Sequence, residues 1–262
     1  MEILVCVRRV PDTSENEIEL NAAGNDIERD DLVYSINEPD NYAVEEALQI
    51  RDGVGGSVTV VTVGGEDDEE ILRRQLAMGA NRAVLLSDDA FNGSDGKGIA
   101  TILKKFIQKE HFDLILTGVQ ADDGAAQVGG MLAAMLDLPF ASLVNSIEPS
   151  EGKLKVSREI EGGNREMNGI ELPCVLSIQT GINEPRYVGM RGIRQVASVP
   201  IPTLAAADLG IAPGTVGTSA AKVVRINYFI PIQGQGAEIL QGSREENAEK
   251  VVEMVAARGG LR

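Results

Sequence analysis

Histidine, cysteine and aromatic residues are scarce in this chain of 262 residues. The single histidine, His111, argues against most His-based metal sites and against any Ser-His-Asp arrangement. The two cysteines, Cys6 and Cys174, are too few and too far apart to indicate a disulfide framework or a zinc site. Aromatic residues make up 3% of the chain, all hydrophobic residues make up 43%, and tryptophan is absent. We therefore expect an aliphatic core and no metal site.

Basic residues and long apolar runs are also lacking. The 24 Lys and Arg residues are outnumbered by 40 Asp and Glu residues, which gives a net charge of −16. Nucleic acid and anionic membrane surfaces require a basic face, so this balance argues against both as partners. No run approaches the ~18 apolar residues of a membrane span, and the first residues form neither a basic nor an apolar signal region. We expect a cytoplasmic protein that is not embedded in a membrane.

Strand-like and helix-like patterns alternate five times between residues 2 and 136. The runs 2–7, 57–63, 83–87 and 114–117 are mostly apolar or β-branched, as expected for parallel strands covered on both faces. The segments between them place apolar residues at spacings of three and four, which is typical of helices. This pattern predicts an α/β fold with a doubly wound, mostly parallel sheet.

The pattern changes after Pro139. Four strand-like stretches joined by glycine turns follow, and we interpret them as antiparallel strands added to the edge of the sheet; they are residues 141–147, 153–160, 165–169 and 172–178. From residue 200 to about 243 the chain is rich in proline and glycine, with one strand-like piece at 222–226. Ser243-Arg-Glu-Glu246 is a capping box, which predicts a last helix that ends near Gly259.

One stretch has the features of a ligand site. Leu114–Gly118 reads as a buried strand, a polar turn follows, and Val128 begins the apolar face of a helix. A tight loop before a helix N-terminus is a common place for a phosphate, because free backbone N–H groups point into it. Asp122 or Asp123 either caps this helix or accepts a hydrogen bond from a ribose hydroxyl. An ordinary strand–helix connection explains the same residues, since no glycine-rich nucleotide fingerprint is present.

Two further features lie near the ends of predicted elements. Pro39 followed by Asp40 or Asn41 predicts a helix in which one of these two polar side chains is the N-cap. Arg8 and Arg9 follow the first strand at its carboxyl end, which faces the ligand crevice in open α/β sheets. They are either solvated loop charges or contacts for an anionic ligand or a partner subunit.

Several motifs resemble those of one protein family. Residues 118–129, GVQADDGAAQVG, resemble the nucleotide-binding loop of electron-transfer flavoprotein β subunits, although the commoner form has one more residue. Residues 36–47, INEPDNYAVEEA, resemble a second signature of that family. Residues 156–177 closely follow a pattern that is diagnostic of these β subunits, except that polar Asn168 stands where an aliphatic residue is usual. The chain is identified as a member of this family by that resemblance.

The resemblance implies a fold, a partner and a role. The family fold is a nucleotide-binding α/β domain related to adenine-nucleotide hydrolases, which here would cover residues 1–200. Residues 201–262 would form a C-terminal arm that wraps an α subunit. The heterodimer would carry electrons from dehydrogenases, such as the acyl-CoA dehydrogenases of fatty acid oxidation, to a downstream quinone-linked acceptor. FAD shared with the α subunit would supply the chemistry, so this chain would be an electron-transfer subunit without catalytic residues rather than an enzyme.

By the same resemblance, AMP would be a structural ligand of this subunit. Some relatives hold a second FAD in its place and bifurcate electrons, and this alternative stays open. The positions that match the family's nucleotide site are Cys6, Asn37, Glu38, Pro39, Asp40, Val63, Gly118, Val119, Gln120, Ala121, Asp122, Asp123, Gly124, Ala125, Ala126, Gln127 and Val128.

Residues 183–194 resemble the start of the family's recognition loop, which docks a dehydrogenase through a protruding Leu. Met190 takes the place of that Leu, Arg191 replaces the usual Pro, and Arg194 remains of a basic cluster. With Tyr187, these residues are the predicted docking contacts. An exposed irregular loop is the alternative interpretation.

A hypothesis from another class is a free-standing regulator of the universal-stress type, which shares the fold and binds ATP or AMP. Such proteins are usually shorter and lack an extension like residues 150–262.

Overall fold

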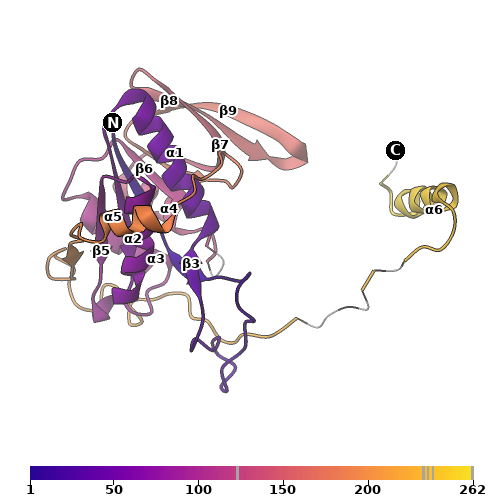
Figure 1. Ribbon diagram of the computed structural model, residues 1–262, viewed down its shortest axis with the longest axis horizontal. Helices are drawn as coiled ribbons and strands as arrows, with labels where there is room; N and C mark the ends of the chain where they lie inside the picture. Colours follow the sequence, from indigo (N-terminus) through magenta and orange to yellow (C-terminus); the bar gives the residue numbers. More distant parts are fainter. Residues whose placement is uncertain (122–123, 232–233, 235, 238, 261–262) are drawn as a thin grey trace. The chain divides into compact units, whose positions relative to one another are not determined.

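The computed structural model describes residues 1–121, 124–231, 234, 236–237 and 239–260. The chain divides into two units. The larger unit comprises residues 1–19 and 28–226 and contains the sheet (Figure 1). The smaller unit comprises residues 20–27 and the chain from residue 227 onward. The division into domains at residue 200 stays a prediction.

Among the described residues, a nine-stranded sheet runs through the larger unit in the order β11-β5-β4-β1-β6-β10-β7-β8-β9. Neighbouring strands are parallel from β11 to β7, whereas β8 and β9 are antiparallel to their neighbours. The strands are β1 (Glu2–Cys6), β4 (Ser57–Val63), β5 (Arg82–Leu86), β6 (Leu114–Gly118), β7 (Phe140–Ser150), β8 (Lys153–Ile160), β9 (Asn164–Glu171), β10 (Cys174–Ile178) and β11 (Thr203–Leu204).

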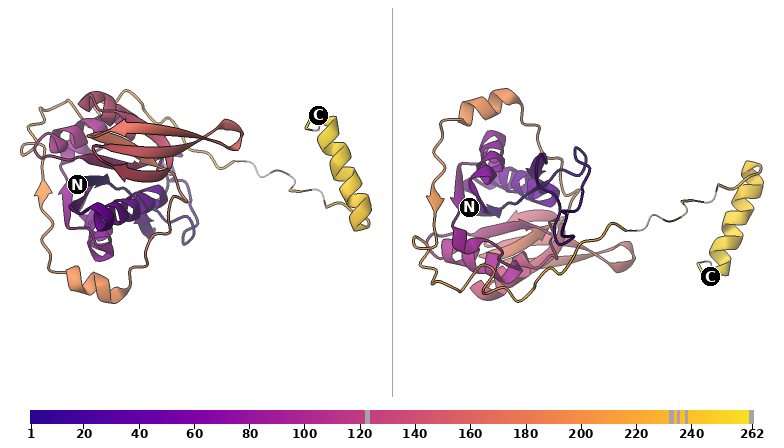
Figure 2. Two further views of the ribbon diagram at one scale, coloured as in Figure 1. Left: turned by 90° about the horizontal axis from the view of Figure 1, so that it is seen from above. Right: turned by 90° about the horizontal axis from the view of Figure 1, so that it is seen from below.

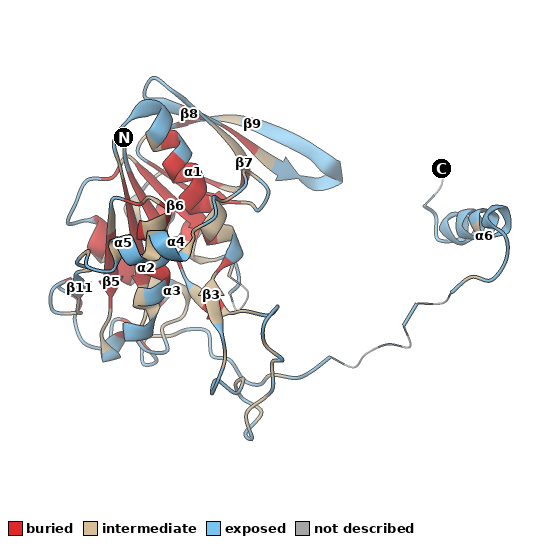
Figure 3. Ribbon diagram, in the orientation of Figure 1, coloured by how far each residue is buried: buried red, intermediate tan, exposed pale blue. Residues whose placement is uncertain are grey.

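Helices cover both faces of this sheet. They are α1 (Glu38–Val54), α2 (Glu69–Met78), α3 (Gly96–Ile107) and α4 (Val128–Leu136). Helix α5 (Met190–Val196) packs against α2, and 3-10 turns lie at Glu66–Asp68, Asp89–Phe91 and Glu161–Gly163. Side chains alternate between the two faces of a strand. In β1, Ile3 and Val5 therefore join the core of α1 and α2, while Leu4 and Cys6 join the core of α3 and α4. The helices on the two faces of the sheet can be followed in Figure 2, and the buried residues in Figure 3. The predicted doubly wound fold is confirmed.

A small antiparallel ribbon connects β1 to α1. Its strands are β2 (Arg9–Pro11) and β3 (Tyr34–Ile36), with Val10 opposite Ser35. The ribbon brings Tyr34 beside Arg9, although a long excursion of the chain separates them in sequence. Side chains of the ribbon thus lie beyond the carboxyl end of β1.

Two strand predictions are wrong in part. The sequence favours an antiparallel edge position for residues 172–178, but β10 lies between β6 and β7 and is parallel to both. All five of its residues are buried, as a position inside the sheet requires. Residues 222–226 form no strand. The N–H groups of Lys222 and Val223 donate to the carboxylate of Asp95 instead of to a neighbouring strand, and β11 occupies the edge beside β5.

The smaller unit contains helix α6 (Arg244–Ala257), which begins at the predicted capping box. Ser243 Oγ accepts the N–H of Glu246 at 3.2 Å, and the Glu246 carboxylate accepts the N–H of Ser243 at 2.8 Å. The apolar side chains of Val251, Val252 and Val255 are exposed. Within the described ranges, no helix is long and apolar enough to cross a membrane.

The substitution Leu116→Ala tests the assignment of the core. Leu116 is fully buried in β6, so loss of its side chain should lower the free energy of unfolding by about 2–5 kcal/mol. Chemical denaturation followed by circular dichroism measures this change. Val54→Ala, at a half-exposed position of α1, is the control and should change the free energy by less than about 0.5 kcal/mol. Equal effects of the two substitutions would contradict the assigned core.

Candidate functional site

A cavity of about 770 Å³ lies at the carboxyl ends of β1, β4 and β6. The loops that follow the strands of a parallel sheet meet at this edge, where open α/β folds bind ligands. The N-terminal ends of α1, α3 and α4 complete the lining. The volume falls within the range of roughly 300–1,000 Å³ that is usual for small-molecule sites. The cavity is therefore the candidate ligand site.

Asp40 joins three elements beside this cavity. It lies in the first turn of α1, where its Oδ2 accepts the N–H of Arg8 and its Oδ1 accepts the N–H of Gly118, both at 2.9 Å. Gly118 allows this approach, because a Cβ there would lie 2.8 Å from the Cβ of Pro39 and closer still to the Asp40 carboxylate. The two hydrogen bonds fix the ends of β1 and β6 against α1. The prediction that Asp40 or Asn41 caps the helix is wrong: Asn37 is the N-cap residue, and its side chain forms no capping bond.

The environment of Asp40 changes its protonation. Burial raises the pKa of Asp40 from 3.8 to about 7, although hydrogen bonds from Asn37, Gly118 and Arg8 favour the charged form. Burial likewise raises the pKa of the neighbouring Cys6 thiol, and the charge of Asp40 adds to this effect. Cys6 is therefore a neutral thiol at physiological pH and offers a ligand only packing and backbone groups.

Asn37 connects α1 to the loop after β6. Its Nδ2 donates to the carbonyl oxygen of Gln120 at 3.0 Å, and its N–H donates to the carbonyl oxygen of Arg8 at 2.8 Å. Its Oδ1 is buried and has no hydrogen-bond partner among the described residues. A buried acceptor without a donor costs free energy. Because Asn37 lines the cavity, a ligand there is a candidate donor for this oxygen.

Among the residues described, four arginines line the cavity of this acidic chain: Arg8, Arg9, Arg29 and Arg225. The Arg9 guanidinium lies 3.8 Å from the ring centre of Tyr34, a cation–π contact that fixes its position. Arg9 Nε is buried and without a partner in the described structure. Asp67 lies 3.9 Å from Arg9 Nη1 but is largely exposed, so water screens this pair. An anion in the cavity would meet a fixed positive charge at Arg9.

The start of α4 also favours an anion. Gln127 is the N-cap residue, and its side chain does not cap the helix. The first N–H groups of a helix have no partner within the helix, and they carry the positive end of its dipole. Because Gln127 and Val128 line the cavity, these groups are near any ligand in it. The predicted caps Asp122 and Asp123 lie outside the described residues.

Residues 217–225 lie along the cavity and are fastened to the loop before α3. The N–H of Gly217 donates to Ser94 Oγ at 2.8 Å, and the N–H of Lys222 donates to Asp95 Oδ2 at 2.7 Å. The backbone hydrogen bond from Lys222 is the main reason why the pKa of Asp95 lies below its ordinary value, and the backbone N–H of Gly98 adds to this effect. Asp95 therefore stays charged at neutral pH and keeps this segment in place.

Comparison with known proteins identifies the family. The family model described as the electron transfer flavoprotein domain matches residues 25–209. The chain is 37% identical over 260 residues to an electron transfer flavoprotein subunit beta of Methylophilus methylotrophus, with 97% of this chain and 98% of the relative covered. It is 33% identical to the subunit beta of Bacillus subtilis, with 97% of each chain covered. A subunit of the caffeyl-CoA reductase–Etf complex of Acetobacterium woodii is 37% identical, with 93% of each chain covered.

The chain belongs to the electron transfer flavoprotein family. The resemblance to its β subunits, seen in the sequence motifs, is thereby confirmed. The name of the family implies a flavin and a role in electron transfer at the level of the family.

The structure gathers most of the residues that match the family's nucleotide site around the one cavity. Glu38 and Pro39 do not line it: Glu38 is exposed, and Pro39 packs against Gly118. The predicted residues that line the cavity are Cys6, Asn37, Asp40, Val63, Gly118, Val119, Gln120, Ala121, Gly124, Ala125, Ala126, Gln127 and Val128. That they bind a nucleotide stays a prediction.

The residues predicted to dock a partner lie elsewhere. Met190, Arg191 and Arg194 belong to the short helix α5, and Tyr187 precedes it. All four are exposed. The alternative of an exposed irregular loop is wrong in part, because residues 190–194 of this segment lie in helix α5, while residues 184–189 are irregular.

The sequence did not point to part of the lining. Tyr34 approaches the cavity from strand β3, and Arg29 and Gly93–Gly96 approach it from parts of the chain without a motif. Residues 218–225 approach it from the proline- and glycine-rich segment. The sequence allows two interpretations of Arg9, and the structure places it in the cavity wall. The sequence feature that indicates this place is the arginine pair Arg8-Arg9 at the end of a strand in an acidic chain.

The substitution Asp40→Asn tests the protonation of Asp40. The pKa of about 7 in the folded protein exceeds 3.8, so the folded state binds this proton more tightly than the unfolded state. The protonated Asp40 carboxyl therefore contributes stability that is fully present below about pH 4 and is lost as the pH rises to about 7. Between pH 4 and 7 the free energy of unfolding should therefore fall more steeply in the wild type than in Asp40→Asn. The difference between the two slopes should be about 1.4 kcal/mol per pH unit. Urea denaturation at each pH measures both slopes. Glu70→Gln, which removes an exposed carboxylate, should retain the wild-type slope, and parallel profiles for wild type and Asp40→Asn would refute the assignment.

Proposed function

We propose that this chain is the β subunit of a heterodimeric electron-transfer flavoprotein and that its cavity binds AMP as a structural ligand. The observation that carries the proposal is the similarity to proteins named subunit beta over almost the whole length of both chains. In this proposal the α subunit supplies most of the FAD site. Residues 201–262 form the arm that wraps it, and the exposed valines of α6 are covered there.

The residues of the cavity fit a mononucleotide. Its phosphate would meet Arg9 and the uncapped N–H groups of α4. A hydroxyl or amino group of the ligand would donate to Asn37 Oδ1, which has no partner in the described structure. The apolar side chains of Val63 and Ile99 also line the cavity and offer packing for a base. Gly118 has no side chain, which leaves room for Pro39 and for the Asp40 carboxylate at the cavity wall.

The proposed role requires no catalytic residue in this chain. FAD, when bound, supplies the redox chemistry, and the protein positions it. The chain itself binds the α subunit and presents Tyr187, Met190, Arg191 and Arg194 to a dehydrogenase such as an acyl-CoA dehydrogenase. Electrons would then pass to a quinone-linked acceptor, in the cytoplasm. Met is a flexible apolar anchor, so Met190 is suited to enter a pocket on a partner.

A second FAD in this cavity, with electron bifurcation, is the other candidate. The names of two relatives favour it. One relative is a subunit of the caffeyl-CoA reductase–Etf complex, and another is named acryloyl-CoA reductase electron transfer subunit gamma.

The amounts of released nucleotide decide between these candidates. The chain should be co-expressed and purified with its α subunit, the complex denatured, and FAD and AMP quantified by chromatography. The AMP proposal predicts about one FAD and one AMP per heterodimer. Two FAD and no AMP would establish the second candidate. A colourless monomer that binds ATP would overturn both and favour a nucleotide-sensing regulator.

The substitution Arg9→Gln tests the anion site. A hydrogen bond to a charged group contributes about 1.5–3 kcal/mol, so loss of the guanidinium should weaken AMP binding by about tenfold or more. Isothermal titration of the nucleotide-depleted heterodimer with AMP measures the dissociation constant. Arg82→Gln is the matched control, because Arg82 pairs with Glu110 away from the cavity. Equal affinities of the two variants would show that Arg9 does not contact the phosphate.

A further inference from the structure

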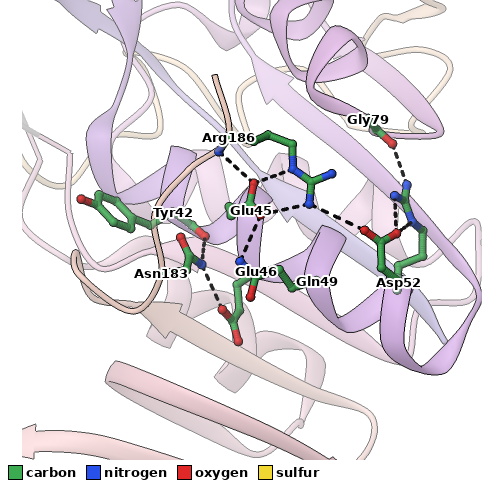
Figure 4. A network of polar contacts seen from close by, with 9 residues as sticks. Tyr42, Glu45, Glu46, Gln49, Asp52, Gly79, Asn183 and Arg186 are labelled. Atoms are coloured by element: carbon green, nitrogen blue, oxygen red, sulfur yellow. Dashed lines mark hydrogen bonds and ion pairs between the residues drawn. The ribbon is translucent and has the colours of Figure 1, made fainter. Parts of the chain in front are cut away.

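The segment that carries the predicted docking residues is fastened to α1 at its first end. Arg186 donates three hydrogen bonds to Glu45 (Figure 4): its N–H to Oε2 at 3.1 Å, its Nε to Oε2 at 2.8 Å and its Nη2 to Oε1 at 3.0 Å. The Glu45 side chain is 5% exposed. Burial alone would raise the pKa of Glu45, but the bonds from Arg186 hold it below its ordinary value. Glu45 is therefore charged at neutral pH and forms a bidentate ion pair with Arg186 in which the carboxylate is buried.

A second contact reinforces this end. Asn183 Nδ2 donates to the carbonyl oxygen of Tyr42 at 3.1 Å and to the Glu46 carboxylate at 2.9 Å (Figure 4). Glu46 is buried in the next position of α1 after Glu45. Consecutive carboxylates of one helix thus hold the chain just before Tyr187.

The far end of the segment is fastened to α2 by a different chemistry. Arg73 Nη1 donates to the carbonyl oxygens of Val196, Ala197 and Val199 at 3.0, 2.9 and 3.1 Å. Glu69 binds the same guanidinium and orients it. The last carbonyls of a helix have no partner within the helix, and an arginine there both satisfies them and matches the dipole. Arg73 therefore caps α5 from outside.

Helix α5 depends on these contacts. It has seven residues, and an isolated helix shorter than about 12–15 residues is marginal in water. It packs against α2, and an added Cβ at Gly192 would be in van der Waals contact with the Ala77 Cβ, at 3.7 Å. Without the two anchors, little would keep this segment in one conformation.

The anchored segment presents an apolar and cationic surface. Tyr187 is 90% exposed and Met190 is 66% exposed. Arg191 and Arg194 are exposed on the same side of α5, three residues apart, and neither forms an ion pair with another described residue. In a chain of net charge −16, two such cations beside an apolar anchor complement a pocket with an acidic rim.

We propose that Glu45 and Arg73 are positioning residues that hold residues 187–195 in a preformed conformation for a redox-partner protein with an acidic rim around an apolar pocket. The proposal rests on the docking role given to this segment under Proposed function. Preformation lowers the conformational cost of association, so a partner meets a binding-competent surface in nearly every molecule. Neither anchor touches the partner.

Hydrogen exchange in the FAD-loaded heterodimer tests the anchors without any partner. Glu45→Gln and Arg73→Gln should each speed the exchange of amides 187–196 by about tenfold or more, while other peptides, FAD content and melting temperature stay close to wild type. Trypsin should cleave after Arg191 or Arg194 faster to the same degree. The double variant with Glu45→Gln and Arg186→Gln should be no worse than either single variant, since both remove one anchor. Glu110→Gln, which removes a surface ion pair with Arg82, is the matched control.

Electron transfer from a purified acyl-CoA dehydrogenase with its acyl-CoA tests the consequence. The concentration of heterodimer at half-maximal FAD reduction should rise about fivefold or more in the anchor variants, with the maximal rate and the reduction by dithionite unchanged. Unchanged exchange in both variants would overturn the anchoring. Faster exchange with an unchanged half-saturation would overturn the positioning role. A wild-type heterodimer that the dehydrogenase does not reduce would overturn the donor assigned under Proposed function, and the exchange rates would still decide the anchoring.

Discussion

The carboxylate of Asp40 accepts one backbone N–H from the end of β1 and one from the end of β6, and the geometry of the cavity depends on this pair of bonds. The two strands are neighbours in the sheet, so their loops would lie near each other in any case. The carboxylate fixes the distance between these two loops and joins both of them to the first turn of α1. A buried carboxylate loses hydration, which is why its pKa rises. Its hydrogen bonds offset part of that loss. The remainder is an unfavourable contribution of the charged Asp40 to the free energy of folding.

Helix α1 serves both candidate sites. Asn37 and Asp40 at its start shape the cavity, while Glu45 and Glu46 two turns later hold the segment that leads to α5. Its apolar face, which includes Val44, packs on the sheet. One rigid element therefore supplies the reference frame for the ligand site and for the exposed docking segment. A change in the packing of α1 would affect both.

The features that could be predicted are those that neighbouring residues determine. The boundaries of β4 match the β-branched run 57–63, and the capping box at Ser243 begins α6 as expected. The features that could not be predicted depend on residues far away in sequence. Asp40 has the sequence context of a helix cap, but the N–H groups that it accepts come from Arg8 and Gly118.

The same limit applies to the sheet and the site. An apolar run such as 174–178 indicates a buried strand but not the strands between which it lies. Its place between β6 and β7 follows from pairing over long separations. The motif residues of the loop 118–128 were found from the sequence, whereas Tyr34 and residues 218–225 reach the cavity through the ribbon and through bonds to Asp95. Nothing in their local composition marks them as lining residues.

The position of β10 constrains the order of events during synthesis. The chain leaves the ribosome from its N-terminus at roughly 5–20 residues per second, so β6 emerges well before residues 174–178. Until then β6 has β1 on one side and an open apolar edge on the other, which is a template for pairing with other chains. The hairpin of β8 and β9 emerges during that interval, before the strand that joins β7 to the rest of the sheet. A nascent chain stalled before residue 174 would therefore hold two separate β segments, and the edge of β6 would be open to pairing with other chains.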